Sequence, residues 1–175
     1  MRDGIPLPRA AWGSTLETFV GPHRVAETFA IDGREEEYAL YFEAPYDLSP
    51  AWTSADGLHA VHLVTDEDWS PATAVLIESA TGDTVGFYAG GELWIEPEHR
   101  GRGLSAALIL CLVDHLGRAA YDTSAGMGFS AAGYAAHAAA HRKAVVWALD
   151  AGIRVPRRVA AAVEARDAPA SAPSA

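Results

Sequence analysis

Two arginines and two glycines alternate near the middle of the chain, between a segment typical of a strand and one typical of a helix. In order, the residues are Arg100, Gly101, Arg102, Gly103, Leu104 and Ser105. Glycine lets the backbone approach a ligand closely because it has no Cβ. The first N–H groups of the following helix point outward at the positive end of the helix dipole, and two guanidinium groups add charge nearby. This combination predicts an anion site, most naturally for a phosphate or a pyrophosphate.

The segment differs from the two best-known nucleotide-binding loops. A Walker A loop has the spacing G-x-x-x-x-G-K-[ST], and both this spacing and its lysine are missing here. A dinucleotide fingerprint, G-x-G-x-x-G, would need glycine at Ala106. A glycine-rich strand-to-helix connection with solvated arginines is the alternative that stays open.

The segment resembles the phosphate-binding segment of the GNAT superfamily of N-acyltransferases. That family's signature is R/Q-x-x-G-x-G/A, often within a strand, proline, loop and helix context. Arg100 and Gly103 fill the first and fourth positions, Ser105 takes the last one, and Pro97 stands at the family's usual offset. With the three strands expected before the loop, the likeness covers about residues 73–116, and the second half of the chain departs from the family.

The resemblance implies that acetyl-CoA is the acyl donor. Backbone amides of about Gly101 to Ala106 would hold its pyrophosphate, and the preceding strand would pair with the pantetheine arm. A backbone N–H of that strand would also polarise the thioester carbonyl. The cofactor-binding residues implied in this way are Leu93, Trp94, Ile95, Arg100, Gly101, Arg102, Gly103, Leu104, Ser105 and Ala106.

Direct attack by an acceptor amine needs a base to take its proton and an acid to protonate the leaving thiolate. The resemblance implies Glu92, at the start of the strand, as a base that acts directly or through water. The alternative for Glu92 is a charged strand-end residue in solvent. It implies Tyr134, one turn into a long helix, as the acid, since a phenol stays protonated at neutral pH. The alternative for Tyr134 is an amphipathic core residue.

His137 and His141 stand four residues apart, on one face of the same expected helix. Two histidines at this spacing can share a metal ion. The sequence offers no third ligand, so we expect no metal. A position of His137 facing the acceptor pocket is a further hypothesis.

The pattern of apolar residues indicates which elements hold the loop. Apolar and aromatic segments between turn residues predict strands at 38–42, 58–64, 74–78, 84–88 and 92–95. The first half of the chain is therefore expected to consist of strands and loops. Helices are predicted at 104–116, about 130–152 and 157–166.

These elements predict an α/β (α+β) domain, a mixed, mainly antiparallel sheet with helices packed on it. Residues 1–166 are expected to form this single domain, and by resemblance its centre is GNAT-like. The first of the three helices is apolar on most sides, which predicts that it is buried against the sheet. Residues 167–175, rich in Ala, Pro and Ser, are expected to be a disordered tail.

The 175-residue chain carries 23 acidic and 13 basic residues, a formal charge of −10. This balance disfavours nucleic acid as a partner. It favours a cationic acceptor among small-molecule or peptide amines. The single cysteine, Cys111, excludes an internal disulfide framework. We expect a cytoplasmic protein without a membrane partner, because no apolar run approaches the roughly 18–20 residues of a membrane span and the N-terminus has no signal core.

Two functions follow as hypotheses. The first is an N-acetyltransferase that moves the acetyl group of acetyl-CoA to an unidentified amine. The second is a non-catalytic GNAT-like module that binds CoA or another anion and has a structural or interaction role. A homodimer is a further partner to be tested.

Overall fold

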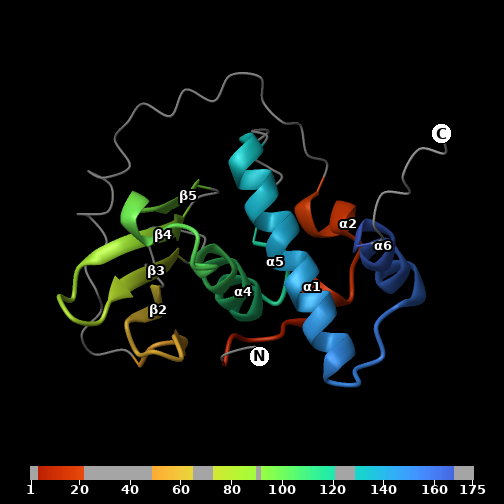
Figure 1. Ribbon diagram of the computed structural model, residues 1–175, viewed down its shortest axis with the longest axis horizontal. Coiled ribbons are helices and arrows are strands. Elements are labelled where there is room, and N and C mark those ends of the chain that lie inside the picture. Colours follow the sequence, from red (N-terminus) through yellow and green to blue (C-terminus); the bar gives the residue numbers. More distant parts are fainter. Residues whose placement is uncertain (1–3, 22–48, 65–72, 90–91, 121–128, 168–175) are drawn as a thin grey trace, which may run out of the picture.

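The computed structural model describes residues 4–21, 49–64, 73–89, 92–120 and 129–167, and the fold is given for these ranges (Figure 1). One antiparallel sheet contains five strands in sequence order, β1 (Trp52–Thr53), β2 (His59–Val64), β3 (Thr73–Glu78), β4 (Thr84–Ala89) and β5 (Glu92–Ile95). The helical elements are α1 (Arg9–Trp12), α2 (Leu16–Val20), the 3-10 helix η1 (Pro97–His99), α4 (Leu104–Leu116), α5 (Ala131–Asp150) and α6 (Arg157–Asp167). The expected α+β fold class is confirmed, and every strand pairing within these ranges is antiparallel.

The register of the sheet gives it two distinct faces. One row across β2 to β5 contains Leu63, Ala74, Tyr88 and Leu93, which belong to the core that also includes α4. Alternation along a strand places the neighbouring row, His62, Val75, Phe87 and Trp94, on the opposite face. There the rings of Phe87 and Trp94 stack with their centroids 5.9 Å apart.

Helix α4 forms the centre of the molecule. Nine of its thirteen residues are buried, and it contacts the sheet, α1 and α5. Figure 1 shows it between the sheet and α5. The predicted bounds are confirmed at both ends, because Gly103 and Gly117 take positive φ angles of 78° and 65° that side chains disfavour.

Helix α5 covers α4 on the side away from the sheet, and small residues bring the two helices together. Ala140 and Ala144 are fully buried in the main core. Ser130 caps the helix by accepting a hydrogen bond from the Gly133 N–H. α1, α2 and α6 pack on α5 in turn. A smaller second core joins α5 to α6 and contains Val145, Ala148, Val155, Val159 and Val163.

The secondary structure of the N-terminal part of the chain differs from the prediction. Strands and loops were expected there, but residues 9–12 and 16–20 form two short helices that pack on α5. Helices of one turn carry too few residues to show a helical period, so tertiary packing decides their structure. The strand expected at 38–42 lies outside the described residues. Helix α6 runs through Asp167, one residue beyond its expected end, so the first residue of the expected tail is helical. Residues 168–175 also lie outside the described ranges.

Candidate anion-binding site

The turn between β5 and α4 is folded tightly by its own backbone and by one arginine. Pro97 starts η1, where its missing N–H and fixed φ suit a first helical position. The Arg100 N–H donates to the Pro97 carbonyl at 3.2 Å. The Arg100 side chain turns back, and its Nε–H donates to the Ile95 carbonyl at 2.6 Å. Arg100 therefore ties the end of the strand to the loop and uses only one of its five N–H donors in doing so.

Gly101 and Gly103 are both required by the backbone. Each has a φ of 78°, in the left-handed region where a Cβ is strained. A Cβ at Gly101 would meet nothing within 4 Å, so space is open there. The sequence predicts glycine here for close approach of a ligand, and the backbone angle adds a second reason.

The N-terminus of α4 has no side-chain cap. Gly103 occupies the N-cap position and has no side chain to offer, whereas Thr15 and Ser130 cap α2 and α5. The Ala106 N–H donates to the Gly103 carbonyl at 3.1 Å. In the described part of the chain, no side chain accepts a hydrogen bond from the first-turn amides of α4. The amides of Leu104 and Ser105 can therefore serve an external anion.

A third cation reaches the loop from α5. The Lys143 Nζ lies 2.8 Å from the point where a Cβ on Gly103 would stand. Arg102 is exposed on the same loop. Across the ranges described, neither Lys143 nor Arg102 has a carboxylate within ion-pair distance. Positive charge from two elements thus converges on the uncapped end of α4, and no described carboxylate pairs with it.

Sequence reasoning missed Lys143, because it stands forty residues beyond the loop. One signal was available, since Lys143 is the only lysine of the chain. Its distance from the loop in sequence nevertheless concealed the contact, which depends on how α5 packs against α4.

Strand β5 is placed where the cofactor strand was expected. Leu93 and Ile95 pack on the α4 side, and Trp94 points to the other face of the sheet. β4 pairs with one edge of β5, and no described strand pairs with its outer edge. That edge can offer backbone N–H and C=O groups to an extended ligand.

Tyr134 and Glu92 lie on separate elements. Tyr134 occupies the first turn of α5, is partly buried, and meets the Phe129 ring edge to face at a centroid distance of 6.4 Å. Glu92 is exposed at the start of β5, paired in register with Ala89. The geometry leaves both the catalytic and the structural interpretation of each residue open.

His137 fastens α5 to the sheet. Its Nε2 is 2.7 Å from the Tyr88 hydroxyl, and its Nδ1 is 2.7 Å from the Gly133 carbonyl. Burial lowers the pKa of His137 to about 4, so the ring is neutral at physiological pH. Because a carbonyl only accepts, Nδ1–H donates to Gly133 and the Tyr88 hydroxyl donates to Nε2. His137 thus belongs to the core rather than facing an open acceptor pocket.

His141 is buried too, but it points elsewhere. Its Nε2–H donates to the Ser14 carbonyl at 2.8 Å, and its ring packs against Phe19. Each of the two histidines is therefore engaged by different protein groups. Searching the described residues finds no group of three His, Cys, Asp or Glu side chains that could hold a metal ion.

Residues along α5 contact the region of β5 and its following loop in a regular order. Lys143 reaches the loop that follows β5, while His137 binds Tyr88, the register partner of Leu93. Tyr134 and Lys143 are nine residues apart, a distance of about 13 Å along the helix. Residues 100–105 are called the anion loop below. This loop and Tyr134 therefore lie at opposite ends of this stretch of α5.

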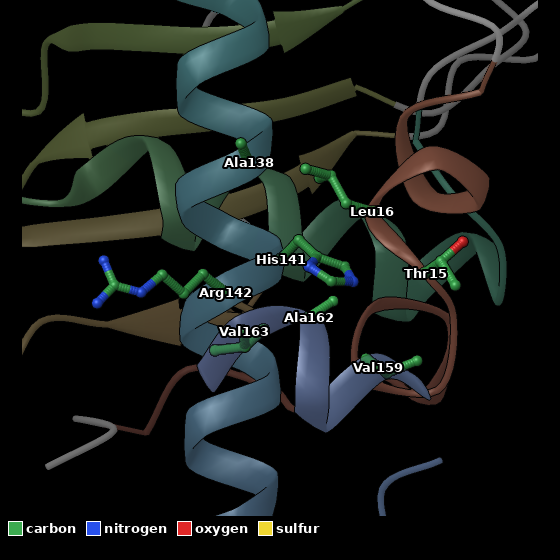
Figure 2. A pocket seen from close by; sticks show the side chains of 8 residues that line it. All are labelled: Thr15, Leu16, Ala138, His141, Arg142, Val159, Ala162 and Val163. Atoms are coloured by element: carbon green, nitrogen blue, oxygen red, sulfur yellow. The ribbon is translucent and has the colours of Figure 1, made fainter. Parts of the chain in front are cut away.

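A small pocket lies between α2, α5 and α6, well outside this loop. Figure 2 shows its lining and the His141 ring at its wall. The pocket holds about 60 Å³, enough for a few water molecules but not for a nucleotide or an extended amine. The residues that line it are Thr15, Leu16, Ala138, His141, Arg142, Val159, Ala162 and Val163.

Comparisons of the chain with protein-family models, with curated proteins and with solved structures return no match. None of the described helices has the length and apolar character needed to cross a membrane. A function must therefore be inferred from the loop, its charges and the helices that hold it.

Proposed function

We propose that this protein is an acyl-CoA-dependent N-acyltransferase that moves an acetyl group from acetyl-CoA to an amine. The observation that carries the proposal is the uncapped N-terminus of α4, with Gly101 and Gly103 at positive φ. Beside it are Arg102 and Lys143, neither of which has an ion-pair partner among the described residues. A diphosphate suits such a site, because it offers several oxygens to backbone amides and two negative charges to the cations.

The strand before the loop suits the rest of the donor. The pantetheine arm of CoA contains two amide groups, which can pair with the outer edge of β5 as a peptide strand would. Leu93 to Ile95 provide that edge, and it leads directly into the loop. In this arrangement the thioester lies toward the start of β5, away from the loop.

The proposed chemistry is a direct acyl transfer. The amine nitrogen attacks the thioester carbonyl, the C–N bond forms, and the C–S bond breaks as the thiolate leaves. Glu92 takes the proton that the amine loses, directly or through water, and Tyr134 gives its phenolic proton to the thiolate. A backbone N–H of β5 stabilises the oxyanion in between. The net charge of −10 attracts a cationic acceptor over long range.

A non-catalytic CoA-binding or anion-binding module is the alternative. The packing of Tyr134 favours it, because this side chain lies against the main core and the Phe129 ring, as a structural tyrosine does. In this case the loop binds the anion in the same way but no acyl transfer follows. Both functions predict that the loop binds the ligand, but only the enzyme transfers an acyl group.

A thiol-release assay distinguishes them. The full chain is incubated with acetyl-CoA and a panel of polyamines, aminoglycosides and peptide amines, and free CoA is detected with a disulfide reagent. The chain adds little background, because burial raises the pKa of its only cysteine, Cys111, to about 12. Amine-dependent release supports the enzyme. Acetyl-CoA binding without release supports the module, and no binding by calorimetry contradicts both.

A further inference from the structure

Two histidines from distant parts of the chain meet beside the anion loop. His59 Nε2 and His99 Nδ1 are 2.9 Å apart, and the rings meet edge to face at a centroid distance of 5.2 Å. His59 is buried in β2, and His99 ends η1 immediately before Arg100. The Glu96 carboxylate lies 3.6 Å from the other ring nitrogen of His99. A chain of groups thus runs from Glu96 through His99 to the second strand of the sheet.

The protonation of the two histidines determines whether the hydrogen bond between them can form. A hydrogen bond between two imidazoles needs one N–H and one lone pair. The neutral pair satisfies this, and so does a pair with one extra proton, in which a charged His99 donates to His59 and faces Glu96. A second extra proton leaves two N–H groups pointing at each other, and the contact is then repulsive.

Several groups around His59 affect its pKa, and hence the binding of the second proton. Burial lowers the pKa of His59 below its usual 6.5, and the nearby His99 and Arg102 lower it further. Asp56, in the turn before β2, and Glu78, opposite on β3, act in the other direction. The lowering causes dominate, so His59 takes its proton at a lower pH than an ordinary histidine.

We propose that His59 and His99 form a positioning pair that holds the anion loop against the sheet. The affinity of the loop for an anion then depends on the protonation of this pair. The coupling to anion binding rests on the proposed function. One extra proton keeps the pair together and adds positive charge next to Arg102, so it strengthens anion binding. Two extra protons break the pair and release the loop.

Linkage fixes the direction of the effect. An anion that binds better to the singly protonated pair raises the pKa of the pair, and protonation raises anion affinity by the same factor. Anion affinity therefore increases when the pair takes its first proton. It decreases again at lower pH, where His59, whose pKa is lowered mainly by burial, takes the second proton and the loop is no longer held.

The binding test uses 3′-dephospho-CoA, because its diphosphate diester keeps the same charge between pH 5 and pH 8. Its affinity for the full chain is measured by calorimetry at pH 8, 6.5 and 5. We expect affinity to rise by up to about tenfold as the first proton binds, as one unit of pKa coupling gives, and this gain to be lost when the second proton binds at lower pH.

The matched control is the double variant H59Q/H99N. Glutamine and asparagine place amide groups near Nε2 and Nδ1, so they can keep the hydrogen bond but cannot titrate. We expect this variant to match the unchanged chain at pH 8 and to show a flat profile below it. The same rise and fall in the variant would overturn the proposal, because the pH dependence would then come from other groups.

A measurement without ligand separates this inference from the proposed function. The ring nitrogens of His59 and His99 are titrated by ¹⁵N NMR, and amide exchange is followed at Gly101 and Gly103. Coupled titration, with faster loop exchange once His59 is protonated, supports the pair even if 3′-dephospho-CoA fails to bind, a failure that contradicts only the acyltransferase. Two independent titrations with unchanged loop exchange would refute the pair itself.

Discussion

Lys143, in the second half of α5, places its Nζ against Gly103, the residue that precedes α4, at 2.8 Å from the position of a Cβ there. This contact joins the helix that carries Tyr134 to the loop that carries the proposed anion site. It also provides the loop with a charge that the loop sequence itself does not contain.

Replacing this amine should weaken donor binding without affecting the fold. We expect Lys143→Ala to lower acetyl-CoA affinity by tenfold or more, because a charge-assisted hydrogen bond contributes about 1.5–3 kcal/mol. Calorimetry at two salt concentrations measures the effect, which should shrink as salt screens the charge. Arg158→Ala removes the same charge from the exposed surface of α6 and should leave affinity unchanged. Equal losses in both variants would show that only net charge matters.

Gly103→Val tests the backbone of the loop. A side chain at a φ of 78° costs at least about 1–2 kcal/mol, and the added atoms stand where the anion should bind. We therefore expect a modest loss of stability and no measurable acetyl-CoA binding. Gly82→Val is the matched control, since Gly82 has a φ of 80° and open space around it but lies in the β3–β4 turn. It should lose similar stability in urea and keep its affinity; unchanged affinity in Gly103→Val would argue against the loop.

The phenol of Tyr134 is tested by Tyr134→Phe. If this residue protonates the thiolate, we expect turnover to fall by roughly a hundredfold or more while acetyl-CoA affinity stays the same. Tyr88→Phe removes a buried hydroxyl that donates to His137, so it should lower stability by about 1–3 kcal/mol. Comparing kcat with melting temperature for the two variants separates a chemical role from a structural one. Equal kcat in Tyr134→Phe and the unchanged enzyme would exclude Tyr134 as the acid.

The neutral, buried His137 should make folding stability depend on pH. Its pKa is about 4 in the folded chain, against 6.5 as the usual value for the unfolded chain. Between these values the unfolded state binds more protons, so the contribution of His137 is complete above pH 6.5 and is lost as the pH falls toward 4. The loss should reach roughly 3 kcal/mol at the lower end.

Urea unfolding at pH 7.5, 5.5 and 4.5 measures this dependence. His137→Gln serves as the control, because its amide can accept from Tyr88 but does not titrate. The difference in unfolding free energy between the two chains should shrink toward low pH. A constant difference would mean that His137 does not carry the effect.

Local patterns were sufficient to predict the centre of the fold. The bounds of α4 follow from an apolar run between Gly103 and Gly117, and β5 follows from a short apolar segment that Pro97 ends. Both elements are defined by neighbours in sequence, so a single sequence contains the information. The loop between them was singled out as a candidate anion site for the same reason.

Contacts between distant segments could not be predicted in this way. Lys143 reaches Gly103 only because alanines let α5 pack closely on α4, and His59 meets His99 across forty residues of sequence. The two short N-terminal helices likewise depend on their packing against α5. No local period or motif marks such relationships, and they supply much of the charge and hydrogen bonding around the loop.

The burial of α4 along most of its length makes one helix both the middle of the core and the wall of the proposed anion site. A ligand bound at the first turn of α4 is thereby attached to the helix that the sheet, α1 and α5 all contact. Occupancy should consequently protect the whole molecule against unfolding rather than a surface loop alone, and the slowest-exchanging amides of α4 would register a ligand bound at its tip.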